Sequence, residues 1–177
     1  MGADILSCAG NITFDGNAAT YNGLRMGGSA TIKGCTFTNH AEAAVYIEGS
    51  GNTFGGTADG ERNIVLDRQI SISGANTTVI GNYFGVTSDG STCDAGPQGI
   101  ELASGSSGTV IGGDAANERN VISCQSSQNI LVKNGAGSAT ISGNYIGTNA
   151  AGTAGIGSGT GIGFESGATY ASAITIG

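Results

Sequence analysis

Two phrases in the chain are each written twice, and the copies alternate along the sequence. "FGGTADGERNIV" at residues 54–65 returns as "IGGDAANERNVI" at 111–122, and "GNYFGVTSDGST" at 81–92 returns as "GNYIGTNAAGTA" at 143–154. The residues that recur are mainly Gly, Asn, Glu, Arg and Tyr. Such duplication predicts a repeat architecture, in which one unit cannot bury its own apolar face and therefore packs against the next unit.

A shorter apolar pattern repeats beneath these phrases. Six triplets begin 21 to 32 residues apart, and the first and third residues of each can face the same side of a short strand. These pairs are Leu24/Met26, Val45/Ile47, Ile70/Ile72, Ile100/Leu102, Ile130/Val132 and Ile162/Phe164. Alternation with a period of two predicts strands that bury one face.

Two further apolar elements follow most of the triplets. The second elements read "ATIKG", "NTFGG", "TTVIG", "GTVIG", "ATISG" and "AITIG", and the third elements read "NIVL", "NYFG", "NVIS" and "NYIG". These runs are too short, too β-branched and too rich in glycine for helices. Three short strands per unit predict an all-β chain that forms a parallel β-helix of about six coils. Stacking the coils about 4.8 Å apart satisfies the hydrogen bonds of the strands.

Each of the third elements begins with an asparagine. We expect these asparagines to stack as an Asn ladder at one corner of the fold, because Asn tolerates tight corners and its amide group can bond to the neighbouring coil. The ladder residues are Asn63, Asn82, Asn120 and Asn144. Cys35 occupies the corresponding place in "GCTFT".

The repeated phrases carry a family resemblance. Over its whole length the chain resembles the right-handed parallel β-helix family of the pectate-lyase-like superfold, and "GGDAANERNVIS" with "GNYIGTNAAGTA" resembles bacterial parallel β-helix repeat proteins. The resemblance implies a right-handed, single-stranded β-helix that forms one domain over residues 1–177. It also implies that the parent protein is extracellular or on the cell surface. No signal peptide is visible, and the ending "AITIG" suggests a fragment of a longer array.

The composition argues against two classes of partner. The chain has 13 acidic and 6 basic residues, and its net charge is −7. The basic residues are scattered, whereas binding to nucleic acid requires clusters of Lys and Arg. No stretch approaches the roughly 18 apolar residues of a membrane-spanning helix. We therefore expect neither a nucleic-acid partner nor a membrane span.

The outward positions of the triplets form what we call the first-strand face. A lyase of this superfold would need clustered aspartates beside basic residues there, and the outward positions hold no aspartate. Glu101 and Glu165 lie two coils apart, which matches the roughly 5–9.5 Å between the carboxylates of a glycosidase. Lys133 on the coil between them favours a surface charge ladder. With Tyr46, these three residues are our candidates for contact with a polysaccharide.

The cysteines and the single histidine predict neither a metal site nor a cofactor. The four cysteines form no CxxC pair, and one histidine leaves too few zinc ligands. Cys93 and Cys124 come close if the coils stack as expected, which leaves a disulfide or two free thiols as alternatives. A nucleophilic pair of Cys35 and His40 is disfavoured, because Cys35 lies at the buried corner rather than at an exposed, polarised position.

Both alternating columns of the third elements are apolar, and only one of them can fill the core. The column that does not fill the core must be covered by a loop or a partner, or stand as an exposed stripe. One column holds Ile64, Tyr83, Val121 and Tyr145, and the other holds Val65, Phe84, Ile122 and Ile146. We favour cover by the long loops that follow the two GNY phrases. Self-association through this third-strand face, or through uncapped ends of the stack, remains the alternative.

Three hypotheses about function follow. The leading one is a non-catalytic structural or binding module of a secreted or surface bacterial β-helix protein, which contacts carbohydrate. The alternative is a polysaccharide lyase or glycoside hydrolase with its site on the first-strand face. Binding to ice or to another crystalline surface would need flat arrays of threonine, and in the sequence the threonines do not align into a regular double column.

Overall fold

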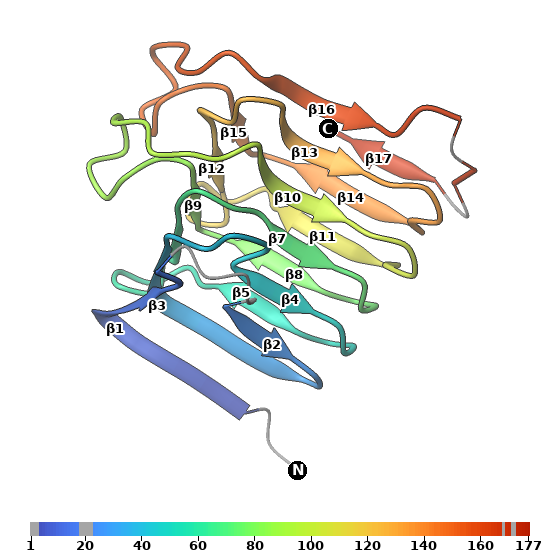
Figure 1. Cartoon of the computed structure of the whole chain (residues 1–177), viewed down its shortest axis with the longest axis horizontal. Helices are drawn as coiled ribbons and strands as arrows, with labels where there is room; N and C mark the ends of the chain where they lie inside the picture. Colours follow the sequence, from blue (N-terminus) through green and yellow to red (C-terminus); the bar gives the residue numbers. More distant parts are fainter. Residues whose placement is uncertain (1–3, 18–22, 168, 171–172) are drawn as a thin grey trace.

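A computed structural model describes residues 4–17, 23–167, 169–170 and 173–177 of the chain. Within these ranges every regular element is a β-strand, and all pairings between the named strands are parallel. The strands are stacked from one end of the molecule to the other in the order of the sequence (Figure 1). The prediction of an all-β chain with parallel strands is confirmed, and no described helix could cross a membrane.

The first sheet contains the six triplets. Its strands pair in the order β16-β13-β10-β7-β4-β2, and they place Leu24 opposite Val45, and Val45 opposite Ile70. The same register continues through the later strands. The bounds are β2 (Leu24–Met26), β4 (Val45–Ile47), β7 (Ile70–Ile72), β10 (Gln98–Leu102), β13 (Gln128–Val132) and β16 (Thr160–Phe164).

The second sheet holds eleven strands and divides into two arms. Its long strand β3 (Ala30–Thr38) pairs through Thr31 and Ile32 with one arm, and through Thr36 and Phe37 with the other. The first arm is β5 (Thr53–Gly55), β8 (Thr78–Ile80), β11 (Thr109–Gly112), β14 (Ala139–Ser142) and β17 (Ile174–Ile176). The second arm is β6 (Ile64–Val65), β9 (Tyr83–Phe84), β12 (Val121–Ile122) and β15 (Tyr145–Ile146).

Strand β1 (Asp4–Asp15) pairs along both halves of β3, with a shift in register between Ser7 and Ile12. The two arms correspond to the second and third apolar elements of the sequence. One strand of the first sheet and one from each arm therefore make up a repeat unit.

The apolar core lies between the two sheets. The inward residues of the first sheet, such as Ile72 and Leu102, pack in one cluster with Val79 and Ile111 of the first arm and with Phe84 of the second arm. All of these side chains are fully buried. Burial of an aliphatic side chain of this size stabilises a fold by about 1.5–3 kcal/mol, so the stacked columns provide the main stabilising force.

Glycine at the end of β5 and of β11 allows the units to stack closely. Gly55 and Gly112 have φ values of +96° and +82°, a backbone region that favours glycine. A Cβ at Gly55 would overlap the carbonyl of Ile80 and the side chain of Asn82 in the next unit. This contact accounts for the first glycine of both "GG…ERN" phrases.

Candidate functional site

The repeated asparagines lie at one corner, between the two arms of the second sheet, and form a continuous hydrogen-bonded column. The backbone N–H of Cys35 donates to Oδ1 of Asn63, and the backbone N–H of each ladder asparagine donates to Oδ1 of the next. The four N···O distances are 2.9–3.1 Å. The column thus runs from Cys35 through Asn63, Asn82 and Asn120 to Asn144.

The side-chain NH₂ groups of the ladder asparagines also donate to carbonyl groups of β3 and of the first arm. Nδ2 of Asn82 donates to the carbonyl of Phe54 at 2.9 Å, and Nδ2 of Asn120 donates to the carbonyl of Val79 at 2.8 Å. Asn63, Asn82 and Asn120 are fully buried. Because buried polar groups without partners are costly, the role of this column is to satisfy the backbone where the chain turns from one arm to the other.

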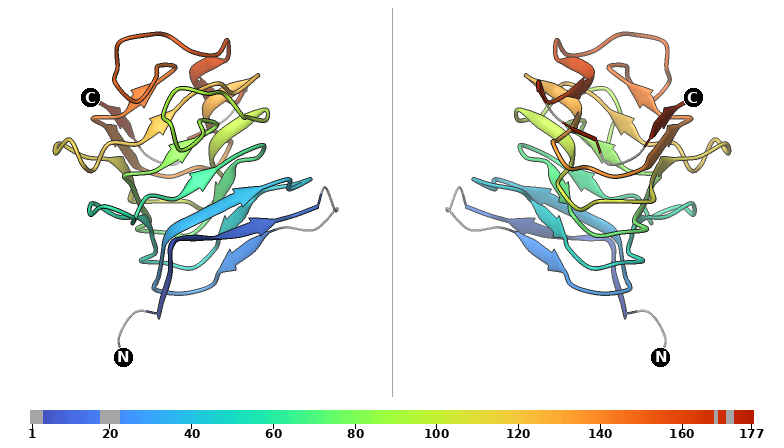
Figure 2. Two further views of the ribbon diagram at one scale, coloured as in Figure 1. Left: turned by 90° about the vertical axis from the view of Figure 1, so that its left-hand side faces the viewer. Right: turned by 90° about the vertical axis from the view of Figure 1, so that its right-hand side faces the viewer.

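The two duplicated phrases contact one another across neighbouring units. The guanidinium of Arg62 lies 4.0 Å from the ring centre of Tyr83, and that of Arg119 lies 4.1 Å from the ring centre of Tyr145. Figure 2 shows the loops of residues 56–62 and 113–119 projecting from the same side of the stack. The arginine of each "ERN" phrase therefore packs on the tyrosine of the "GNY" phrase that follows it.

Loops cover the third-strand face. Tyr83 and Val121 form a second apolar cluster with Val86 from the loop after β9, and with Ala150 and Ile156 from the loop after β15. Tyr83 is only 9% exposed and Val86 is fully buried. The expected loop cover is therefore what the structure contains, and the described residues leave no apolar stripe on this face for self-association.

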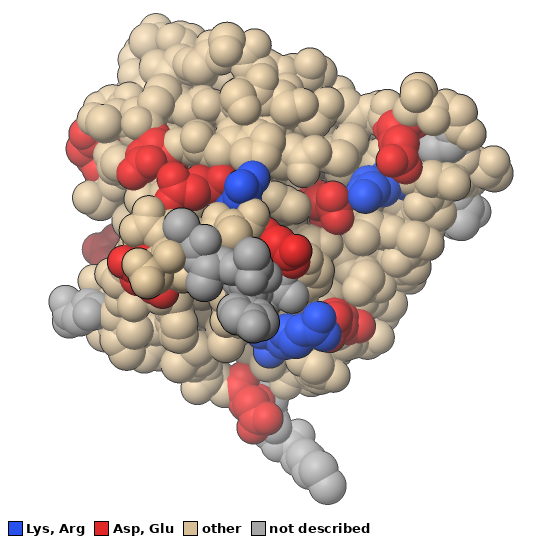
Figure 3. All heavy atoms as spheres, viewed as in Figure 1, with Lys and Arg blue, Asp and Glu red and all other residues tan. Residues whose placement is uncertain are grey.

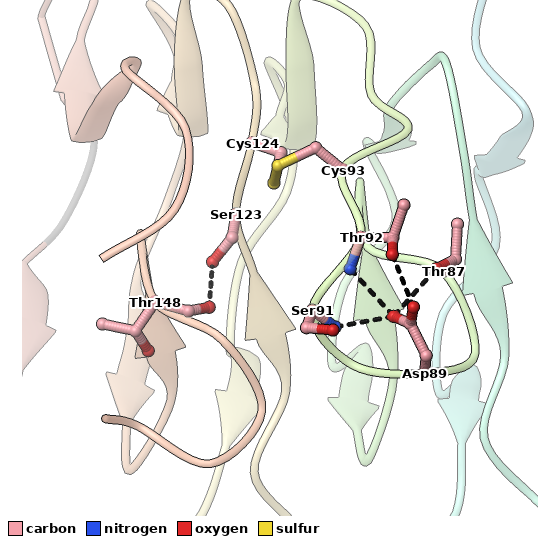
Figure 4. The surroundings of a disulfide bond; sticks show 8 residues. All are labelled: Thr87, Asp89, Ser91, Thr92, Cys93, Ser123, Cys124 and Thr148. Carbon is pink, nitrogen blue, oxygen red and sulfur yellow. Dashed lines mark hydrogen bonds between the residues drawn. A yellow bond between two sulfur atoms is a disulfide. The ribbon is translucent and has the colours of Figure 1, made fainter. Parts of the chain in front are cut away.

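A disulfide holds the loop after β9 against the next unit. Cys93 in the loop is bonded to Cys124, which follows β12 (Figure 4). At the tip of the loop, the carboxylate of Asp89 accepts hydrogen bonds from the backbone N–H groups of Ser91 and Thr92. The hydrogen bond from the hydroxyl of Thr92, followed by these two backbone bonds, holds the pKa of Asp89 far below its ordinary value.

A second disulfide was not expected from the sequence. Cys8 in β1 is bonded to Cys35 in β3, and the described residues include no free cysteine. Cys35 therefore has no thiol with which to form a nucleophilic pair with His40. His40 is buried, and burial lowers its pKa, while the nearby Asp15 and Asp67 partly oppose that shift.

The first-strand face carries two pairs of charged residues of opposite sign, Arg25 with Glu48 and Glu101 with Lys133. At the end of the sheet formed by β2, Arg25 bonds to Glu48 at 2.7 Å, and its guanidinium lies 5.4 Å from the ring centre of Tyr46. Burial, followed by the charges of Glu42 and Glu101, raises the pKa of Tyr46 above its ordinary value. In Figure 3 the few basic side chains each lie beside acidic ones.

Glu101 and Glu165 are each bonded to different neighbours. Glu101 accepts a hydrogen bond from Oγ of Ser71 at 2.9 Å and lies 3.7 Å from Nζ of Lys133. Glu165 instead accepts a hydrogen bond from the backbone N–H of Asn134 at 2.7 Å. The structure thus brings Glu101 and Lys133 together and gives Glu165 a separate, structural partner.

A shallow depression lined in part by ionisable residues lies beside the loop after β6. Asn39, His40, Asp67 and Arg68 line a shallow depression of about 490 Å³ together with Gly96 and Pro97. Burial and the neighbouring carboxylate of Asp67 raise the pKa of Asp94. Among the described residues, no three His, Cys, Asp or Glu side chains are arranged to hold a metal ion.

No family model, curated protein or solved structure matches the chain. Its function therefore has to be inferred from the contacts described above.

Proposed function

We propose that the chain is a non-catalytic structural or binding module of a secreted or surface-exposed bacterial protein, and that it contacts a polysaccharide. Its fold would be a right-handed parallel β-helix of six coils, similar to the pectate-lyase-like superfold. In support, six strands of the first sheet pair in the order in which they follow one another in the chain. Connections between parallel strands are right-handed in nearly all proteins.

The bonds made by the carboxylates of the first-strand face support the proposal that the chain is not a catalyst. Glu101 bonds to Ser71 and pairs with Lys133, and Glu165 holds a backbone N–H group. General acid and base catalysis on a glycoside needs two carboxylates that face the same bond. Here each carboxylate is already engaged by its own neighbour, which favours a surface that positions a ligand without cleaving it.

Tyr46, Glu101 and Lys133 offer a row of groups that suits a sugar polymer. Tyr46 is half-buried and outward-facing in β4, while Glu101 and Lys133 come from β10 and β13. The row crosses several paired strands, which stand about 4.7–4.9 Å apart. A half-buried aromatic ring with charged hydrogen-bonding groups beside it can stack on one sugar and bond to the hydroxyls of the next.

A panel of neutral and acidic polysaccharides tests the proposal. We expect the wild type to bind at least one polymer with no release of reducing ends or unsaturated products, and Tyr46→Ala to weaken that binding. Asp114→Asn, in an exposed loop remote from β4, is the matched control and should bind as the wild type does. Turnover by the wild type that Glu101→Gln abolishes would instead establish a lyase or hydrolase.

A further inference from the structure

The two "GG…ERN" loops enclose a small polar hollow between them. Residues 56–60 of the first loop and residues 116–117 of the second line it, together with Gly81, Arg62 and Arg119. We call it the arginine hollow. Its volume of about 140 Å³ is several times what one water molecule needs. Each arginine belongs to an "ERN" phrase, so the duplication in the sequence brings two guanidinium groups to one hollow.

Each loop is closed by the glutamate of its own "ERN" phrase. The carboxylate of Glu61 accepts the backbone N–H of Ala58 at 3.1 Å, and that of Glu118 accepts the backbone N–H of Ala115 at 3.0 Å. Neither glutamate is among the residues that line the hollow. The walls are therefore held in place before a ligand arrives, which reduces the entropy that is lost on binding.

The guanidinium groups of Arg62 and Arg119 have no carboxylate partner. In the described part of the chain, every ion pair involves another basic residue. Arg119 donates from Nε to the carbonyl of Gly143 at 2.8 Å, and no hydrogen bond from Arg62 is formed within the same residues. Two unpaired positive charges at one hollow favour an anionic ligand, although the net charge of the chain is −7.

Both guanidinium groups are oriented by aromatic rings. Arg62 lies over the ring of Tyr83 and Arg119 over the ring of Tyr145, at 4.0 and 4.1 Å from the ring centres. A guanidinium that lies over a ring still has N–H groups on its edge, and these match the oxygens of an oxyanion in pairs. The tyrosines of the "GNY" phrases thus hold the arginines without using their hydrogen-bond donors.

The acidic residue that lines the arginine hollow is Asp59. A carboxylate accepts hydrogen bonds and donates none, so it favours an anion that carries a proton on one of its oxygens. Inorganic phosphate keeps at least one proton near neutral pH, whereas sulfate keeps none. The combination of two arginines with one aspartate therefore favours phosphate over sulfate.

We infer that the arginine hollow binds inorganic phosphate. The unprotonated oxygens of the anion accept hydrogen bonds from Arg62 and Arg119, and the protonated oxygen donates to Asp59. This inference goes beyond the proposed function, because the two loops join the first arm to the second arm of the second sheet. The first-strand face, by contrast, is the outer side of the first sheet.

Titration with inorganic phosphate, measured by isothermal calorimetry, tests the inference. We expect the wild type to bind phosphate, and Arg62→Gln and Arg119→Gln each to weaken this binding by roughly tenfold, because each loses a charged pair of donors. Arg68→Gln makes the same change in net charge at the other end of β6 and should bind as the wild type does. Circular dichroism should show that all three variants are folded.

The choice of anion is tested with sulfate. We expect the wild type to bind sulfate roughly tenfold more weakly than phosphate. Asp59→Asn should bring the two affinities together, because an amide can donate to an unprotonated oxygen. Methyl phosphate, which has largely lost its last proton near neutral pH, should bind the wild type more weakly than inorganic phosphate does.

Four outcomes would overturn the inference. One is a wild type that binds no phosphate, and another is a loss of affinity in Arg68→Gln equal to that in Arg62→Gln, which would mean that only net charge matters. The third is equal binding of sulfate and phosphate by the wild type. The last is tighter binding of methyl phosphate than of inorganic phosphate, which would assign the hollow to a phosphate group on a larger molecule.

Discussion

Asn82 shows how one side chain connects three strands. Its Oδ1 accepts the backbone N–H of Asn63, and its Nδ2 donates to the carbonyl groups of Phe54 and Ile80. Its own backbone N–H is bonded to Asn120. Asn carries a carbonyl acceptor and a separate NH₂ donor with two hydrogens on a shorter stem than Gln, which explains why the same residue recurs at this corner.

Replacement of Asn82 by alanine should therefore destabilise the fold strongly. The backbone N–H of Asn63 and the carbonyl of Phe54 would both lose their side-chain partner in a buried place. Each such group costs roughly 1–3 kcal/mol. Equilibrium unfolding in urea measures the loss. Asn117→Ala, which removes a single 3.2 Å hydrogen bond at an exposed position, serves as the control and should change stability little.

The raised pKa of Asp94 predicts that the stability of the protein depends on pH. Burial and the carboxylate of Asp67 raise the pKa of Asp94 above its ordinary value of 3.8. The protonated form is thus favoured in the folded state, and its contribution is present below pH 3.8 and is lost as the pH rises through the raised pKa. At neutral pH the charged side chain opposes folding.

Asp94→Asn should accordingly stabilise the protein at pH 7, because the amide carries no charge. The advantage over the wild type should shrink as the pH falls through the raised pKa toward 3.8, and it should be lost below 3.8, where the wild-type side chain is neutral in both states. Urea midpoints measured for both proteins across this range test the idea. A constant difference at every pH would show that the ionisation of Asp94 plays no part.

At the scale of elements, the third strands depend on the loops that follow them. Strands β9, β12 and β15 are two residues long, which is too short to protect an apolar face. The loops after β9 and β15 supply Val86, Ala150 and Ile156 as cover. The loop after β9 is further attached by the bond between Cys93 and Cys124, whereas the loop after β15 has no disulfide.

Removal of this disulfide should loosen one loop and spare the stack. We expect the double variant Cys93→Ser/Cys124→Ser to lose roughly 2–4 kcal/mol of stability. Amide hydrogen exchange should become faster at residues 86–97, because the loop can then lift away from Tyr83. Ser91→Ala in the same loop keeps the bond and should exchange as the wild type does. Unchanged exchange in the double variant would mean that apolar packing alone holds the loop.

On the scale of the whole molecule, stability and surface chemistry follow from stacking. Each strand in the middle of a sheet contacts mainly the strands of the units before and after it, so the fold is close to a one-dimensional array. The inner columns give one continuous core, and the outer columns give two separate faces. A charged, partly aromatic face lies on the first sheet. The outer side of the first arm of the second sheet carries the aligned residues Thr31, Thr53, Thr78, Val110, Thr140 and Thr175.

Much of the strand arrangement could be predicted from the sequence. Which residues align on the outer faces of the sheets could be predicted only in part. The six triplets are strands in one sheet, because alternating apolar residues have one side on which they can be buried. The alignment of threonines along the first arm was missed, although Thr31, Thr53, Thr78 and Thr140 each stand directly before a buried apolar residue. Alignment of the second elements on those inward residues would have located it.

The sequence by itself determined that the chain is built from short repeated strands, which side of the six triplets is buried, and which residues recur at the asparagine corner. Local periodicity and the conformational preferences of Gly and Asn suffice for these features. Only the tertiary structure decided that Cys8 bonds to Cys35, that Glu165 turns to a backbone N–H, and that loops cover Tyr83. Those contacts join residues from different units, whose lengths vary, so their partners are settled only when the units stack.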